Sequence, residues 1–245
     1  MIVAAALCPC PPLLATELTG QADILPELRD ACAAALACLL AAAPDVVAVV
    51  GPAETTGTWD PAGELSLASY APVLSPGGPL APDDSADFPV AAPPLPLALG
   101  IGALLLDNAG YAGPRIIQGI AGSEPAADCL ALGRKLAASA PRVALLAVGD
   151  GTARRSQSAP GYLDERAAPF DESVARAVRD ADLPALAALN PALATDLMAV
   201  GRPAWQALAG ALLTGHSSAG RLQTEILYSD APLGVAYLVA TIVLQ

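Results

Sequence analysis

The sequence predicts an α/β fold, with a central, mostly parallel mixed β-sheet covered by helices on both faces. Two observations predict it. Continuous apolar runs of strand length, at residues 46–50 and 143–148, indicate strands that are buried on both faces. Segments with apolar residues at steps of three and four, which is the spacing of a helix face, lie between such runs. The chain has 245 residues, of which 54% are hydrophobic, so it can bury a large core and we expect one domain, residues 1–245.

The first part of the chain contains two predicted strands around a helix. Residues 2–7 form an apolar run that Pro9 ends, because proline cannot continue a strand ladder. Residues 24–43 are predicted to be helical, since leucines recur at helical spacing and Pro26 stands in the first turn. The strand at residues 46–50 follows and leads into a polar loop.

Residues 59–96 are the least regular part of the sequence. They hold many prolines and show little periodicity, so we expect a long irregular excursion with a short strand near residues 64–70. We interpret this excursion as a lid, a packing flap or an interface arm.

The rest of the chain alternates predicted helices and strands. Gly100 and Gly102 would let the first of these helices approach the sheet closely, and Asp171 is placed to cap a later one. The predicted helices are residues 97–108, 126–139, 172–179, 183–189, 191–198 and 203–213, and the predicted strands are residues 115–120, 143–148, 222–228 and 235–244.

Composition argues against several partners. The net charge is −12, from 24 acidic and 12 basic residues, which repels phosphate backbones and argues against nucleic-acid binding. No apolar stretch reaches the ~18 uninterrupted residues of a membrane span. The five cysteines are odd in number and lie mostly among alanines, as in a reducing compartment. The first residues read as a strand and not as a signal peptide, so we expect a cytoplasmic protein.

The loop after residues 143–148 is the first candidate for a site. A buried strand that ends in Gly149-Asp150-Gly151 delivers polar side chains to the carboxyl edge of the sheet, where open α/β sheets keep their ligands. Asp150 is either a site residue or a turn residue. Arg154 is either solvated or in contact with an anionic or hydroxylated ligand.

The order of the loop motifs resembles the class III extradiol ring-cleavage dioxygenases of the protocatechuate 4,5-dioxygenase catalytic-subunit type and their Memo-like relatives. In that family a strand ends in a Ser-Gly-Asp-Leu-Ser-His-Arg type segment, and here the corresponding residues are 148–154, Val-Gly-Asp-Gly-Thr-Ala-Arg. The family's Pro-His-Pro-Pro corresponds to Pro9-Cys10-Pro11-Pro12, and its Ser-Pro-His turn to Gly51-Pro52-Ala53. The resemblance covers nearly the whole chain and implies the α/β fold of the family's catalytic subunit.

The same resemblance implies a degenerate metal site. It places Cys10, Ala53 and Ala153 where the family has histidines. A non-haem Fe(II) oxygenase needs two imidazoles and a carboxylate, and this chain contains one histidine, His216. A two-histidine site cannot be formed within one subunit, so we expect no cofactor. The alternative is Fe(II) or zinc held by Cys10, His216 and Glu225, the acidic residue that loosely matches the family's carboxylate ligand.

Three function classes stay open. The expected one is a non-ring-cleaving pseudoenzyme or binding protein, whose vacated pocket takes a small aromatic or anionic ligand with Glu54, Asp150 and Arg154 at its rim. The second is an enzyme with altered chemistry, without metal or with a different one, in which Asp150, Arg154 and His216 act as catalytic groups. The third is a true extradiol dioxygenase for a catechol-type aromatic, with ligands from another subunit. His216 could equally cap the end of the helix before it.

We also expect a homo-oligomer, most simply a dimer. Residues 59–96 and 235–244 offer more apolar surface than one core of small side chains needs, and symmetric pairing is the common way to cover such surface.

Overall fold

The computed structural model describes residues 1–19, 24–67, 70, 93–215 and 221–244. Within these residues, seven strands form one mixed sheet: β1 (Ile2–Cys8), β2 (Val46–Ala53), β3 (Gly57–Trp59), β4 (Arg115–Ala121), β5 (Val143–Val148), β6 (Leu222–Asp230) and β7 (Tyr237–Leu244). The strand order is β3-β4-β2-β5-β1-β7-β6. The four central strands β4, β2, β5 and β1 run parallel, and β3, β7 and β6 are antiparallel to their neighbours. The predicted fold class is therefore confirmed.

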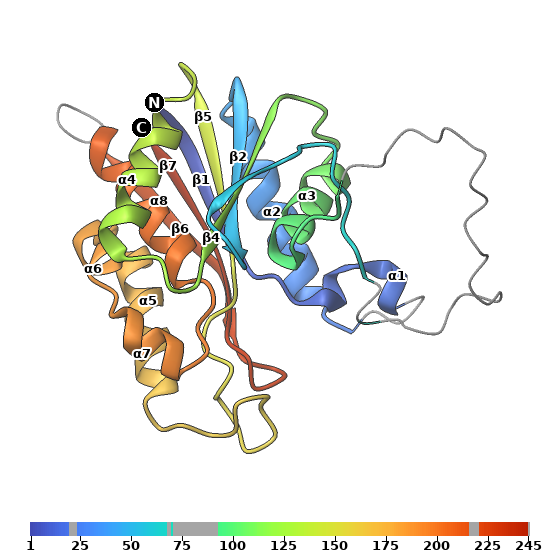
Figure 1. Cartoon of the computed structure of the whole chain (residues 1–245), viewed down its shortest axis with the longest axis vertical. Coiled ribbons are helices and arrows are strands. Elements are labelled where there is room, and N and C mark those ends of the chain that lie inside the picture. Colours follow the sequence, from blue (N-terminus) through green and yellow to red (C-terminus); the bar gives the residue numbers. More distant parts are fainter. Residues whose placement is uncertain (20–23, 68–69, 71–92, 216–220, 245) are drawn as a thin grey trace.

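Helices cover both faces of this sheet (Figure 1). One face carries α2 (Pro26–Ala41) and α3 (Leu97–Asn108), and the other carries α4 (Ala126–Ala137), α5 (Ala167–Arg179), α6 (Leu183–Ala187), α7 (Pro191–Asp196) and α8 (Arg202–Gly215). A 3-10 turn, Pro12–Leu14, and the short α1 (Thr16–Thr19) follow β1. None of the helices in the described residues is both long and apolar enough to cross a membrane.

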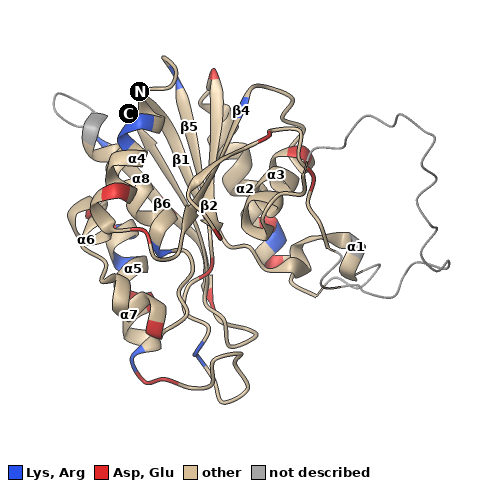
Figure 2. Ribbon diagram, viewed as in Figure 1, with Lys and Arg blue, Asp and Glu red and all other residues tan. Residues whose placement is uncertain are grey.

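The central strands are apolar throughout because each face of the sheet packs against helices. In β1, Ala5 and Leu7 belong to the core beneath α4–α8, whereas Ala4, Ala6 and Cys8 belong to the core beneath α2 and α3. Successive side chains of a strand point to opposite faces. Figure 2 shows that the charged residues lie mainly on helices and in loops, while the central strands are almost free of them. The continuous apolar runs in the sequence thus reflect two cores and not one.

Helices α4 and α8 approach each other unusually closely. A Cβ atom built on Gly133 of α4 would stand 1.8 Å from the Ala207 carbonyl oxygen of α8. A Cβ atom on Gly210 of α8 would stand 2.3 Å from the carbonyl oxygen of Leu130 in α4. Glycine at both positions lets the two backbones pack in contact, which no larger residue allows.

Several predicted elements have different bounds in the structure. Helix α5 begins at Ala167, so Asp171 lies inside the helix and the prediction that it caps a helix starting at residue 172 is wrong. No strand spans residues 64–67 or 70 in the described part of this segment; instead Leu65 forms an isolated bridge with Leu95. The short edge strand β3, which pairs with β4, was not predicted, because its three residues are too few to show a period.

The structure also removes one of the two reasons for expecting a dimer. Residues 237–244 form β7, which lies between β1 and β6, and most of its side chains are buried within the subunit. This apolar segment therefore leaves little surface for a partner. Most of the second segment, residues 71–92, lies outside the described residues. The dimer stays a prediction.

Candidate functional site

A large cleft opens at the carboxyl ends of the parallel strands. Cys8 of β1 is level with Val148 of β5, and Val50 of β2 is level with Ala147 of β5, so these three strands end at one edge of the sheet. The cleft has a volume of about 1120 Å³, enough for a drug-sized molecule. Among the residues predicted from the sequence, it brings together Cys10, Ala53, Glu54 and Asp150.

Asp150 lines this cleft because the chain turns sharply after β5. The N–H of Gly149 donates to the carbonyl of Cys8 (2.9 Å), and a Cβ on Gly149 would stand 2.5 Å from the Cα of Gly201. Glycine is therefore needed at the turn. The Asp150 carboxylate accepts a hydrogen bond from the Cys10 N–H (2.7 Å), and the Asp150 carbonyl accepts one from the Gly201 N–H (2.8 Å).

Burial changes the acid–base properties of the groups around Asp150. Desolvation raises the pKa of the Asp150 carboxyl to about 6, against the opposing effect of its hydrogen bonds with Cys10. Burial, followed by the charge of Asp150, raises the pKa of the Cys10 thiol well above its ordinary value. Burial, together with Asp150 and Cys10, likewise raises the pKa of the Tyr237 hydroxyl. Cys10 and Tyr237 therefore stay protonated near neutral pH, and Asp150 is the group of the three that can change its charge there.

The other predicted site residues lie elsewhere. Glu54 is exposed at the cleft rim. Ala153 is buried, with its N–H donating to the Leu197 carbonyl (3.1 Å), and it is not among the described residues that line the cleft. The expectation that Ala153 lines the pocket with Cys10 and Ala53 is therefore wrong, because the loop after Asp150 turns toward β7, where Gly151 donates to the Ala236 carbonyl (2.8 Å).

Arg154, Glu225 and His216 also do not join the described cleft. Arg154 is half-buried and lies outside the cleft lining, and its Nε is buried without a hydrogen-bond partner among the described residues. The expectation that Arg154 stands at the rim of the cleft is therefore wrong, because the loop that holds Ala153 and Arg154 turns toward β7 after Asp150. Glu225 is exposed on the edge strand β6, away from the cleft. The prediction for His216 falls on a residue outside the described residues.

The residues present do not fit the iron site that the resemblance implies. Ala53 and Ala153 carry no side-chain atom that could bind a metal. In the described part of the chain, no group of three or more His, Cys, Asp and Glu side chains is arranged to hold a metal ion. Cys10 and Asp150 form a contact pair, and neither is joined by a further metal-binding side chain in that part of the chain.

Asp171 has a structural role that the sequence did not reveal. Its carboxylate accepts hydrogen bonds from the Thr152 N–H (2.9 Å) and hydroxyl (2.6 Å), and it forms an ion pair with Arg155 (3.1 Å). Burial raises the pKa of this carboxyl. Asp171 therefore ties α5 to the loop after β5 and fixes the course of that loop beyond Asp150.

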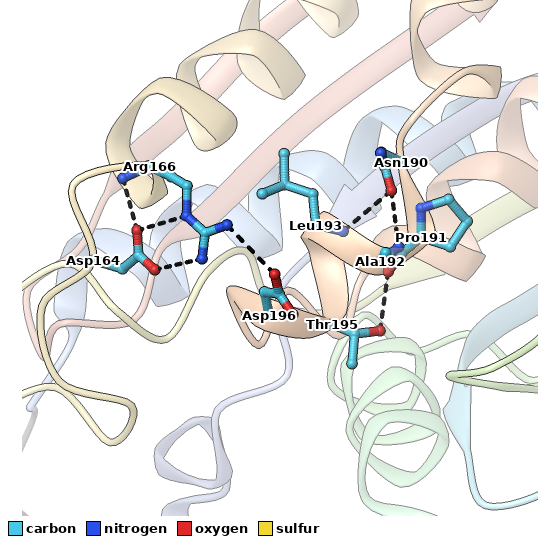
Figure 3. A network of polar contacts seen from close by, with 8 residues as sticks. All are labelled: Asp164, Arg166, Asn190, Pro191, Ala192, Leu193, Thr195 and Asp196. Atoms are coloured by element: carbon cyan, nitrogen blue, oxygen red, sulfur yellow. Dashed lines mark hydrogen bonds and ion pairs between the residues drawn. The ribbon is translucent and has the colours of Figure 1, made fainter.

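One wall of the cleft is formed around α7, which is anchored by polar contacts (Figure 3). The Asn190 side chain caps α7 by accepting from the N–H groups of Ala192 (2.9 Å) and Leu193 (3.2 Å). At its other end, Asp196 forms an ion pair with Arg166 (3.4 Å), which also pairs with Asp164 (2.8 Å). These exposed pairs add little stability. They do link the cleft wall to the segment that leads into α5.

Arg202 is a cleft residue that the sequence analysis missed. It begins α8, lines the cleft beside Gly122 and Ser123, and is only 1% exposed. Its Nη1 donates to the Glu124 carbonyl (2.8 Å) and to Gln206 Oε1 (2.8 Å), with the Cys129 sulfur at 3.8 Å. Its Nη2 donates to the Gly122 carbonyl. The only signal in the sequence was an arginine beside the proline that opens a predicted helix, and that position gives no hint of burial.

Comparisons with known proteins define the fold and no more. No protein-family model matches the chain, and no curated protein sequence matches it. Among solved structures, the chain is similar to an uncharacterized protein, JW3007, from Escherichia coli K12, with a TM-score of 0.53. The two are 16% identical, and the match covers 98% of this chain and 99% of the other. The chain thus shares its α/β fold, over nearly its full length, with this protein.

Proposed function

We propose that this chain binds a small aromatic or anionic molecule in the cleft, on a fold related to the class III extradiol dioxygenases whose metal site is degenerate. The observation that carries the proposal is that Cys10, Ala53 and Asp150, from three parallel strand ends, line one cleft of about 1120 Å³. Its lining is mostly apolar, as small-molecule sites are, with a few polar groups. In this proposal the protein binds its ligand without cleaving an aromatic ring.

A binding screen tests this function. Ligand-observed NMR with catechol, benzoate and other small aromatic acids should detect binding to the unmodified protein. The Ala53→Trp variant places a large side chain in the cleft and should abolish that binding. Ala127→Trp makes the same change at an exposed position of α4 and should leave it intact. Binding that survives Ala53→Trp, or no binding by any compound of the screen, would count against the cleft.

A second candidate is a metal-independent enzyme that uses Asp150 for proton transfer. The observation that favours it is the carboxyl pKa of about 6 inside a ligand-sized cleft, since a general base works best with a pKa near the operating pH. Turnover of a bound compound that Asp150→Asn eliminates without weakening binding would support this candidate. Equal turnover by the variant would exclude Asp150 as the base.

The cytoplasm is the proposed location. All five cysteines are free thiols in the structure, and four of them are buried, as expected in a reducing compartment.

A further inference from the structure

Arg202 is a buried cation that no carboxylate neutralises within the described residues. Its hydrogen bonds go to two backbone carbonyls and to the neutral side-chain amide of Gln206. These bonds satisfy N–H groups, but they leave the positive charge of the guanidinium uncompensated. A buried charge is strongly disfavoured unless an opposite charge accompanies it.

The neighbouring groups do not supply that opposite charge. The Glu124 carboxylate forms no ion pair with Arg202 within the described residues and instead accepts a hydrogen bond from the Thr56 hydroxyl. The Cys129 sulfur is near Arg202, yet burial raises the pKa of this thiol to about 11, despite the opposing effect of Arg202. The thiol is therefore uncharged at neutral pH.

Arg202 has unused donors and lies at the cleft. A guanidinium carries five N–H donors. The two on Nη1 and one on Nη2 have partners, while Nε–H and the second Nη2–H have none in the described part of the chain. Arg202 lines the cleft together with Gly122, whose carbonyl its Nη2 contacts. A guanidinium N–H such as the Nε–H of Arg202 donates a stronger hydrogen bond to a carboxylate oxygen than to a neutral acceptor.

The two charged side chains of Asp150 and Arg202 have different partners. The Asp150 carboxylate points to Cys10, which follows β1, whereas the Arg202 guanidinium binds Gly122, which follows β4. The backbones lie close, since the Asp150 carbonyl accepts from the N–H of Gly201, but no ion pair joins Asp150 and Arg202 within the described residues.

We propose that Arg202 binds the carboxylate of a monoanionic ligand whose apolar body fills the cleft, an inference that rests on the proposed binding function. Among the described lining residues, Arg202 is the sole Arg or Lys, and Glu54 and Asp150 disfavour a second negative charge. One positive charge suits a monocarboxylate better than a phosphate dianion. The body of the ligand would contact the apolar residues Trp59, Leu97, Met198 and Val200.

Matched acid and amide probes test the proposal on the unmodified protein. We expect 3-phenylpropanoate to bind at least about tenfold more tightly than 3-phenylpropanamide in calorimetric titrations, since the charged hydrogen bonds to Arg202 are lost with the amide. The acid, but not the amide, should also shift the Arg202 Nε–H resonance in ¹⁵N spectra. Inorganic phosphate should leave that resonance unmoved.

Variants assign the effect to Arg202. Arg202→Met should remove the preference for the acid, Arg202→Lys should keep part of it, and the control Arg134→Met, at an exposed position of α4 outside the cleft lining, should leave it unchanged. A preference that persists in Arg202→Met, or a phosphate affinity equal to that of the acid, would overturn the inference. Should Arg202→Met fail to fold, the acid–amide comparison and the Nε–H shift in the unmodified protein still test whether Arg202 binds the carboxylate.

The two proposals fail in distinguishable ways. Equal binding of acid and amide that Ala53→Trp abolishes would refute the role of Arg202 and leave the binding function standing. No binding in the cleft by either probe, or by any other compound of the screen, would refute both.

Discussion

Replacing Asp150 by asparagine should change how the stability of this protein depends on pH. Burial raises the pKa of the Asp150 carboxyl from 3.8 to about 6 in the folded protein, while the unfolded chain keeps an ordinary value. The folded state therefore binds the proton more tightly, and the free energy of unfolding falls as pH rises from about 4 to about 6. The difference between the two pKa values corresponds to about 3 kcal/mol.

Urea unfolding from about pH 4 to about pH 7.5 measures this effect. The asparagine side chain of the variant has no charge, and its oxygen can still accept from the Cys10 N–H, which in the native protein lies 2.7 Å from the Asp150 carboxylate. We expect the free energy of unfolding of Asp150→Asn, relative to that of the native protein, to rise by about 2.5 kcal/mol across this range. The raised pKa of Asp171 acts equally in both proteins and cancels in the difference.

A control and a clear negative outcome make the test decisive. Glu54→Gln removes a carboxylate from the exposed rim of the same cleft, so it reports the effect of net charge alone. The contrary result is a free energy of unfolding of Asp150→Asn, relative to that of the native protein, that stays constant or falls as pH rises. It would refute the inference that desolvation raises the pKa of the Asp150 carboxyl.

Two further predictions concern packing and metal. Gly133→Ala should lower the free energy of unfolding by about 3 kcal/mol or more in urea titrations, because the new methyl group would overlap a carbonyl of α8. Gly122→Ala, where a Cβ meets nothing within 4 Å, should change it by less than about 0.5 kcal/mol, and equal losses would contradict the packing of α4 on α8. Protein purified anaerobically with Fe(II) should carry no stoichiometric iron and should not open protocatechuate. The triple variant Cys10→His, Ala53→His, Ala153→His should also fail to bind iron, because Ala153 does not line the cleft; near one iron per chain in elemental analysis would prove this wrong.

The sequence predicted the strands and longer helices well because their signals are local. The predicted bounds of α3 and β5, at residues 97–108 and 143–148, agree with the structure. A buried strand needs an unbroken apolar run and a helix needs an apolar stripe, and both patterns are complete within the element itself. Gly102 was also interpreted correctly, since a Cβ there would stand 2.5 Å from Val49 of β2.

The placement of Cys10, Ala53 and Asp150 at one edge of the sheet could also be inferred from the sequence. All three follow predicted parallel strands, and parallel strands bring their carboxyl ends to the same edge. The reasoning failed at Ala153, because counting along the loop cannot show where the loop turns. Hydrogen bonds to Ala236 in the β6–β7 connection decide that direction.

What the sequence determined by itself was the α/β class, its central strands and the sheet edge that holds the cleft, because apolar periodicity and strand order follow from neighbouring residues. Only the tertiary structure decided which polar groups lose water in that cleft. Asp150 and Arg202 read as ordinary turn and helix-start residues, and their burial results from contacts with Cys10, Gly122 and Glu124, which are distant in the chain. Desolvation depends on everything that surrounds a group in space, so no local pattern can report it.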